Sequence, residues 1–288
     1  MASDLLFSEV IVLTRRELIL AAAAPALFAK KSGFKIGVTD WNLRMTGKIE
    51  AVALAAKLGF EGVEVSLGRN AGGNKLPLDN SEIQAQYVAE AKKHNIKLAG
   101  TCLDILHVNY LKNDKLGQKW VADGIQITRK LNARVMLMPF FGKGAMANET
   151  EMDYVADVLK ELAPEAVKAG VLIGLEDTIS AADNVRIMDR VKSKALMVYY
   201  DVGNSTRNGF DVVKEIRWLG ARRICQIHLK DEGYLGEGKI DFPRVIKTID
   251  DTGYKAFANF ETSSPSKNIE GDMLRNLAYV RKLMSDAG

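Results

Sequence analysis

The feature that most constrains the fold is a strict alternation of short apolar strands and amphipathic helices from Phe34 to Met284. Each expected strand leads into a loop and then a helix. The strands are nearly continuous apolar runs, as is typical of parallel strands buried on both faces. Eight such units over about 250 residues favour a single α/β domain, a closed (β/α)8 TIM barrel, over an open doubly wound sheet.

The pattern predicts strands at 34–39, 62–66, 96–101, 133–139, 171–176, 196–201, 223–228 and 255–261. It predicts helices at 47–58, 80–94, 116–131, 151–168, 181–192, 210–219, 241–252 and 271–284. A nucleotide-binding open sheet needs a Gly-rich turn after its first strand, and none is present. The Gly/Asn-rich loop at 68–75 is long enough to contact a substrate.

The first 29 residues differ from the rest of the chain. Arg15 and Arg16 precede an Ala-rich apolar run that ends in small residues up to Ala29. This pattern resembles a twin-arginine export signal. Residues 1–29 are therefore predicted to be the signal and 30–288 the barrel, and the protein is expected in the periplasm. If the segment is instead an N-terminal helix of the enzyme, the expected location is the cytoplasm.

The charge and cysteine content exclude several classes of protein. The net charge of +4 comes from 40 basic and 36 acidic residues spread along the chain, which argues against nucleic-acid binding and stable membrane association. No stretch after residue 33 approaches the roughly 20 apolar residues of a membrane span. Cys102 and Cys225 follow or lie in expected strands far apart in sequence, so they are predicted to be buried thiols and not a disulfide.

Polar side chains stand at the ends of the last four expected strands. Strand five ends in Glu176, strand six in Asp201, strand seven in His228 and strand eight in Glu261, which are 25, 27 and 33 residues apart. The carboxyl ends of consecutive barrel strands are neighbours on one rim. Three carboxylates and one imidazole should therefore meet at the barrel mouth.

Such a cluster favours the binding of a cation. Three carboxylates in a low-dielectric site repel one another, and a divalent metal removes the conflict. Oxygen-rich ligands with one nitrogen favour Mn²⁺, with Mg²⁺ and Co²⁺ as alternatives. A single acid at a strand end is often only a helix cap or an ion-pair partner, but four polar residues at successive strand ends indicate a site.

Several segments around these residues resemble the sugar isomerase/epimerase family with a xylose-isomerase-like TIM barrel. The segments are Leu175–Asn184, Tyr200–Asn204, Ile227–Asp231, Gly236–Phe242 and Phe260–Glu261. The resemblance covers residues 34 to about 285.

The resemblance implies specific roles for the four rim residues. Glu176, Asp201, His228 and Glu261 would hold the metal, and the two glutamates would transfer the proton from opposite faces of a sugar. The metal would stabilise an enediolate, because a Lewis acid lowers the cost of an oxyanion beside a carbonyl.

The sequence departs from the ketose 3-epimerases of that family at substrate-reading positions. Asn204 stands where they usually carry a His. The stretch Lys230–Tyr234 lacks the Arg that usually contacts substrate, and Ala181 and Ala182 stand where a second acid is usual. These differences argue against a free-ketose 3-epimerase. They leave keto-sugars, sugar acids, inososes and glycoside-derived substrates open.

Four residues are candidate substrate contacts: His107, Lys230, Trp41 and Asn204. His107 could equally be a loop histidine without a role in binding. Lys230 either binds substrate or neutralises Glu261, and otherwise it pairs with Asp231. Trp41 is expected to form an apolar wall for a sugar ring, although aromatic residues near a barrel rim are often core.

The leading prediction is a metal-dependent isomerase or epimerase of a sugar or sugar-like polyol. The alternative is a metal-dependent lyase or dehydratase of a keto-sugar or inosose at the same site, and a non-catalytic sugar-binding barrel is a further hypothesis. A related barrel endonuclease needs several zinc-binding histidines, and this chain has 3 histidines. The expected partner is a small carbohydrate. The sequence identifies neither the sugar nor the oligomeric state, and it is compatible with an oligomer.

Overall fold

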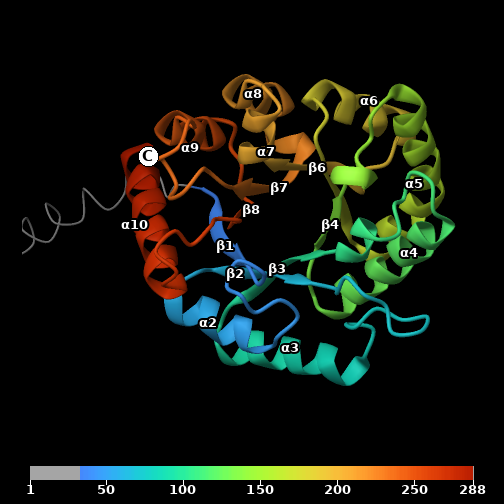
Figure 1. Cartoon of the computed structure of the whole chain (residues 1–288), viewed down its shortest axis with the longest axis horizontal. Coiled ribbons are helices and arrows are strands. Elements are labelled where there is room, and N and C mark those ends of the chain that lie inside the picture. The colour runs from blue at the N-terminus through green and yellow to red at the C-terminus, as the bar shows by residue number, and fades with distance from the viewer. Residues whose placement is uncertain (1–32, 288) are drawn as a thin grey trace, which may run out of the picture.

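A computed structural model of the chain describes residues 33–287. Its eight strands are parallel and form a closed barrel in the order β1 to β8 (Figure 1). The barrel closes where β8 pairs with β1, with Lys35 opposite Phe257. The predicted TIM barrel is therefore confirmed. The predicted export signal at 1–29 lies outside the described residues.

The strands are β1 (Lys35–Thr39), β2 (Gly62–Ser66), β3 (Lys97–Cys102), β4 (Val135–Pro139), β5 (Leu172–Glu176), β6 (Leu196–Asp201), β7 (Ile224–Leu229) and β8 (Phe257–Phe260). The outer helices are α2 (Glu50–Leu58), α3 (Ser81–Lys93), α4 (Lys115–Lys130), α5 (Glu149–Ala169), α6 (Ala181–Val191), α8 (Val212–Arg223), α9 (Phe242–Asp251) and α10 (Ile269–Ala287). Shorter elements at the barrel mouth are η2 (Asp104–His107), η3 (Gly142–Gly144) and α7 (Val202–Arg207).

Local sequence signals set most helix ends where they were expected. The Asn80 side chain accepts hydrogen bonds from the backbone of Glu82 and Ile83, which caps α3. Gly59 ends α2 with a left-handed φ of 89°, a conformation that glycine adopts without a steric penalty.

A helix start and a missed helix are the differences from the expected elements that bear on the site. Helix α2 begins at Glu50 and not at Gly47, because the Gly47 backbone N–H donates to Asp40 Oδ2 and is held outside the helix. The short helix α7 directly after Asp201 was not expected from the sequence at all. Strand β6 is consequently followed by a helix and not by a loop. Asp201, at the end of β6, is the N-cap of this helix.

The interior of the barrel below its mouth holds a polar layer. The Asn259 side-chain amide donates to Gln226 Oε1 at 2.9 Å and to the Tyr199 hydroxyl at 2.7 Å. Gln226 in turn donates to the Ala99 carbonyl oxygen at 2.6 Å. A Cβ at Gly37 would lie 2.0 Å from Asn259 Oδ1, so glycine there makes room for this layer.

Apolar packing surrounds the polar layer in two clusters. The larger one joins the outward faces of the strands to the helices, as in other α/β barrels. The smaller one includes Cys102 and Cys225, which are both buried and free, so the prediction of unpaired thiols is confirmed. Among residues 33–287, no helix combines the length and apolar character that crossing a bilayer requires.

One buried carboxylate links the β1 exit to the end of β2. Asp40 Oδ2 accepts hydrogen bonds from the backbone of Gly47 at 2.9 Å and Ser66 at 3.1 Å. Its other oxygen has no hydrogen-bond partner in the described part of the chain. Burial, together with the nearby Asp104 and Glu64 carboxylates, raises the pKa of Asp40 to about 7.

We expect the substitution Asp40→Asn to stabilise the protein above pH 7. The folded-state pKa of Asp40 exceeds its unfolded value of 3.8, so wild-type stability falls as pH rises from about 4 to about 7, by on the order of 4 kcal/mol. Asparagine keeps the acceptor for both backbone groups and carries no charge. Denaturant midpoints at pH 5 and pH 8 measure the difference, with the exposed Asp189→Asn as control. An equal effect of Asp40→Asn at both pH values contradicts this account.

Candidate metal centre

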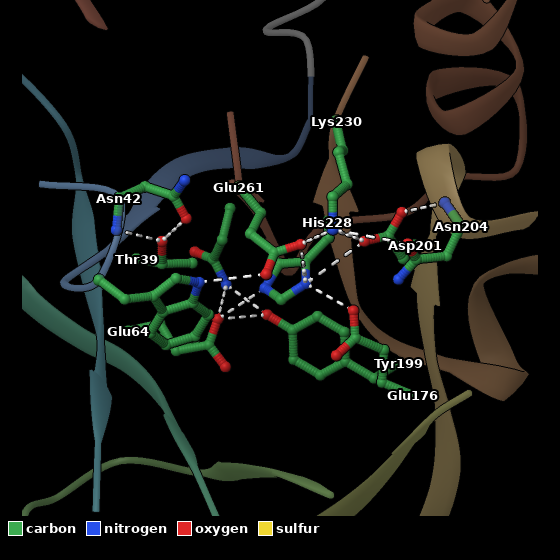
Figure 2. A network of polar contacts seen from close by, with 12 residues as sticks. Thr39, Asn42, Glu64, Glu176, Tyr199, Asp201, Asn204, His228, Lys230 and Glu261 are labelled. Atoms are coloured by element: carbon green, nitrogen blue, oxygen red, sulfur yellow. Dashed lines mark hydrogen bonds and ion pairs between the residues drawn. The ribbon is translucent and has the colours of Figure 1, made fainter. Parts of the chain in front are cut away.

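The four rim residues predicted from the sequence meet at one point at the carboxyl end of the barrel (Figure 2). Glu176 ends β5, Asp201 ends β6, His228 is the penultimate residue of β7, and Glu261 directly follows β8. One ligand atom from each lies within 4.8 Å of the others. The barrel topology therefore brings together residues that lie far apart in the chain.

His228 stands at the centre of the cluster and is fully buried. Its Nδ1 lies 2.9 Å from Glu176 Oε1 and 3.8 Å from both Asp201 Oδ2 and Glu261 Oε2. One ring nitrogen of His228 thus faces all three carboxylates. The other ring nitrogen faces away from them, into the barrel.

Helix α7 fixes the orientation of Asp201. Asp201 is its N-cap, and its Oδ1 accepts a hydrogen bond from the Asn204 backbone N–H at 2.7 Å. This bond occupies one carboxylate oxygen and leaves Oδ2 facing His228. Asn204 therefore contributes to the site through its backbone, whatever its side chain does.

Burial and neighbouring charges shift the pKa values of the rim residues. Burial, together with the Glu261 and Asp201 carboxylates, raises the pKa of Glu176 to about 8 against the opposing effect of His228. Burial also raises the pKa of Asp201. Burial alone would lower the pKa of His228, but the surrounding carboxylates hold it well above its usual range.

Glu261 is the exception among the carboxylates. Burial favours its neutral form, but the charges of His228 and Lys230 bring the pKa of Glu261 below its usual value. Hydrogen bonds from Lys230 and Trp41 act in the same direction. Glu176 and Glu261 therefore have pKa values shifted in opposite directions although they share one cluster.

The donor set fits a divalent cation. Three carboxylates and one imidazole nitrogen are within reach of a single ion, and hard, oxygen-preferring divalent metals take such ligands. The ion would replace the proton that His228 and Glu176 otherwise hold. Among the described residues, this is the group of His, Cys, Asp and Glu side chains that could hold a metal.

Two predicted substrate residues contact the rim directly. The Trp41 indole Nε1 donates to Glu261 Oε1 at 3.1 Å, so Trp41 holds a carboxylate as well as presenting a ring. The Lys230 ammonium contacts Glu261 Oε2 and lies 3.5 Å from Asp201 Oδ2. Of the alternatives for Lys230, the structure has the ion pair with Glu261. The alternative pair with Asp231 was wrong, because Asp231 accepts from backbone groups of its own loop instead.

The other two predicted substrate residues line a cavity above the rim. His107 at the end of η2 stacks on Phe141, with ring centroids 6.3 Å apart. The Asn204 side chain lies 3.5 Å from Lys230 Nζ and accepts from Arg207 at 3.3 Å. The cavity measures about 550 Å³, and its walls include both of these residues, Glu176, Lys230 and Glu261. Substrate contact by these residues stays a prediction.

Sequence reasoning missed Glu64 in β2, which lies below the rim and contacts His228 Nε2 at 2.9 Å. An acid flanked by two valines inside a buried strand was the signal that could have found it. It also missed Arg207, Arg69 and Asp104 in the cavity wall. These three lie in loops or short helices, whose paths the sequence pattern does not give.

The fold and the rim define an α/β barrel protein with a candidate metal centre at the carboxyl ends of its strands. Residues 52–283 match the model of the xylose isomerase-like TIM barrel family, so the chain belongs to this family.

Several known proteins are similar to this chain. L-ribulose-5-phosphate 3-epimerase UlaE of Salmonella typhi is 24% identical over 264 residues, which cover 83% of this chain and 91% of that protein. A structure of L-ribulose 3-epimerase matches with a TM-score of 0.72 at 16% identity, over 88% of this chain and 95% of that one. The 3-keto-D-glucoside 4-epimerase YcjR of E. coli matches with a TM-score of 0.68 at 15% identity, over 86% and 99%.

We expect a divalent metal to raise the melting temperature of the wild-type protein. Mn²⁺ at one hundred times its Kd contributes about 2.7 kcal/mol. For a chain of this size that corresponds to a shift of about 5–10 °C. The variant Asp201→Asn should lose most of this shift, because asparagine still caps α7 but carries no charge. Melting curves of EDTA-treated protein with and without Mn²⁺ measure both effects. An unchanged wild-type melting temperature contradicts the metal centre.

Proposed function

We propose that this protein is a divalent-metal-dependent isomerase or epimerase of a sugar or sugar-like polyol. The observation that carries the proposal is the pair of glutamates, Glu176 and Glu261, that converge on His228 at the base of a polar cavity. Their pKa values are shifted in opposite directions. Titratable groups separated in this way are suited to the acid and base roles of proton transfer.

In this proposal Glu261 begins as the base. The low pKa of Glu261 keeps it ionised, and Trp41 and Lys230 each hold one of its oxygens in place. Glu261 takes a proton from the carbon beside the substrate carbonyl. The ion pair with Lys230 limits the motion of the carboxylate, which keeps the transfer distance short.

Glu176 is the proposed proton donor on the opposite face of the substrate. In the metal-free site burial raises the pKa of Glu176 to about 8, so its carboxyl accepts and returns a proton more readily than that of Glu261. Return of the proton to the opposite face of the same carbon gives epimerisation, and return to the neighbouring carbon gives aldose–ketose isomerisation. The metal, bound by the four rim residues, would supply Lewis-acid stabilisation of the negative charge on the substrate oxygen.

A sugar or polyol is the substrate class that the surroundings support. The cavity is bounded by His107, Phe141 and Trp41, which offer ring faces, and by Asn204 and Lys230, which offer hydrogen bonds. A further recess of about 620 Å³ shares Trp41 and Lys230 with it. The named epimerases that resemble this chain act on pentulose or keto-glycoside substrates, which supports carbohydrate chemistry here.

A lyase or dehydratase of a keto-sugar or inosose is the second candidate. Loss of a β-hydroxyl group after proton abstraction requires an acid to protonate the leaving oxygen. Glu176 with its raised pKa could serve in that step as well. The same metal and the same base would then give a different product.

We expect incubation in D₂O with Mn²⁺ to place deuterium on a substrate carbon without loss of water. The panel should contain ketoses, aldoses, inososes and 3-keto-glycosides, and NMR with mass spectrometry identifies the product. An isomerase or epimerase gives a product of the same formula with one exchanged carbon-bound hydrogen. Loss of water or of an aglycone contradicts the isomerase and supports the lyase.

The variants Glu176→Gln and Glu261→Gln serve as controls on the same substrate. Each should lower kcat by at least about 10²- to 10⁴-fold, the range for loss of general acid–base catalysis. The fold should persist, because glutamine matches glutamate in size. Full turnover by both variants rules out the assigned proton-transfer pair.

We further propose that residues 1–29 are an export signal of the twin-arginine type and that residues 30–288 form the working enzyme. A reporter fused after residue 29 should reach the periplasm of a bacterial host. Replacing Arg15 and Arg16 by lysine should retain it in the cytoplasm, because the export machinery reads the arginine pair. Fractionation followed by immunoblotting measures the distribution. Export of the variant at the wild-type level contradicts the signal and favours a cytoplasmic enzyme.

A further inference from the structure

A fourth carboxylate, Glu64, lies directly beneath the rim and belongs to none of the predicted sites. Both Glu64 and His228 are fully buried. Glu64 Oε2 lies 2.9 Å from His228 Nε2, the ring nitrogen that faces away from the rim carboxylates (Figure 2). The imidazole is therefore held between Glu64 on one side and the candidate metal site on the other.

The hydrogen bonds around Glu64 form a chain in which Glu64 is the final acceptor. The Asn259 amide donates to the Tyr199 hydroxyl oxygen at 2.7 Å. The Tyr199 hydroxyl has its own hydrogen left to donate, and its oxygen lies 2.8 Å from the same Glu64 Oε2. Glu64 Oε2 is thus an acceptor that receives a hydrogen bond from Tyr199.

This arrangement favours one tautomer of the His228 ring. Glu64 Oε2 already accepts from the Tyr199 hydroxyl, so its contact with His228 is best met by a second donor, an N–H at Nε2. Nδ1, which faces Glu176, Asp201 and Glu261, is then the nitrogen left to bind a cation in place of its proton.

We propose that Glu64 is a positioning residue that sets the tautomer and ring orientation of His228 for metal binding. A histidine ligand commonly donates its second N–H to a carboxylate, which fixes the ring and makes the ligating nitrogen more basic. Glu64 does not reach the rim, so it acts only through His228. This inference rests on the proposed metal centre.

A packing role alone does not account for a glutamate at this position. Glu64 Oε1 has no hydrogen-bond partner among residues 33–287, although it is buried. An unpaired buried polar atom destabilises a fold. A glutamine or an apolar residue of similar size would avoid the charge. The contact with His228 is the interaction that requires the carboxylate.

The decisive variant is Glu64→Gln, which keeps the size and removes the charge. Its amide can also donate to His228 Nε2, which would move the ring hydrogen to Nδ1 and block ligation. We expect Mn²⁺ to bind about 10- to 100-fold more weakly than to the wild type, the usual effect of losing such a partner. Titration of EDTA-treated protein with Mn²⁺, with free Mn²⁺ detected by electron paramagnetic resonance, measures Kd without any substrate.

Two further variants separate positioning from general stability. Tyr199→Phe removes the donor to Glu64 but leaves the carboxylate, so it should weaken Mn²⁺ binding by a smaller factor than Glu64→Gln. Glu61→Gln is the matched control, because Glu61 accepts from the Ile36 backbone at the amino end of β1 and lies outside the cluster. It should leave the Mn²⁺ affinity unchanged.

The tautomer can be observed directly in the wild-type protein. The chain contains 3 histidines, so ¹⁵N spectra of the Mg²⁺-loaded protein are simple to assign. We expect the His228 hydrogen on Nε2 in the wild type, and a changed ratio of tautomers in Glu64→Gln. If Glu64→Gln does not fold, the Mn²⁺ affinity of Tyr199→Phe still tests the proposal, and a wild-type affinity there contradicts it.

The outcomes distinguish this proposal from the one on which it rests. Failure of the wild type to bind Mn²⁺ or Mg²⁺ refutes the metal centre itself. Wild-type binding together with an unchanged Kd in Glu64→Gln overturns the positioning role alone. A His228 hydrogen on Nδ1 in the loaded wild type refutes ligation through that nitrogen.

Discussion

The structure depends on one electrostatic constraint, the crowding of buried carboxylates around His228. Glu176, Asp201 and Glu261 surround one ring nitrogen, and Glu64 contacts the other. Charges of one sign at these distances repel strongly when water is excluded. A divalent ion at the rim, together with the ammonium of Lys230, would balance the three rim carboxylates. The site is therefore arranged for a cation before any substrate enters.

The barrel supplies this arrangement through its closed, parallel topology. Strand ends that lie dozens of residues apart become neighbours on one rim, so each of the last four βα units contributes one side chain to the cluster. Below the rim, the polar layer of Tyr199, Gln226 and Asn259 takes the place of the branched apolar side chains that usually fill such barrels. Hydrogen bonds from this layer reach Glu64, which contacts His228 from below, while α7 orients Asp201 from the side.

The side chains that a substrate in the cavity would meet lie further out, above the rim. Asn204, Lys230 and Arg207 share one wall of the cavity, and His107 belongs to another part of its lining. Lys230 is already engaged with Glu261, so the two side chains would face a substrate together. Arg207 brings a guanidinium into the wall from α7, a segment in which the sequence pattern gave no sign of a helix. The rim and this wall of the cavity are thus built partly from the same segments, since Asn204 closely follows Asp201 and Lys230 closely follows His228.

The sequence by itself determined the barrel, the order of its elements and the four rim residues. Strand period, helix caps and the polar residues at strand ends are local signals, and parallel closure converts them into one site. Only the tertiary structure determined which side chains contact one another around the site. The contact of Glu64 with His228 joins residues 164 positions apart, and the ion pair of Lys230 with Glu261 joins residues 31 apart. Such contacts depend on strand register and side-chain direction inside the closed barrel, and no local pattern in the chain encodes them.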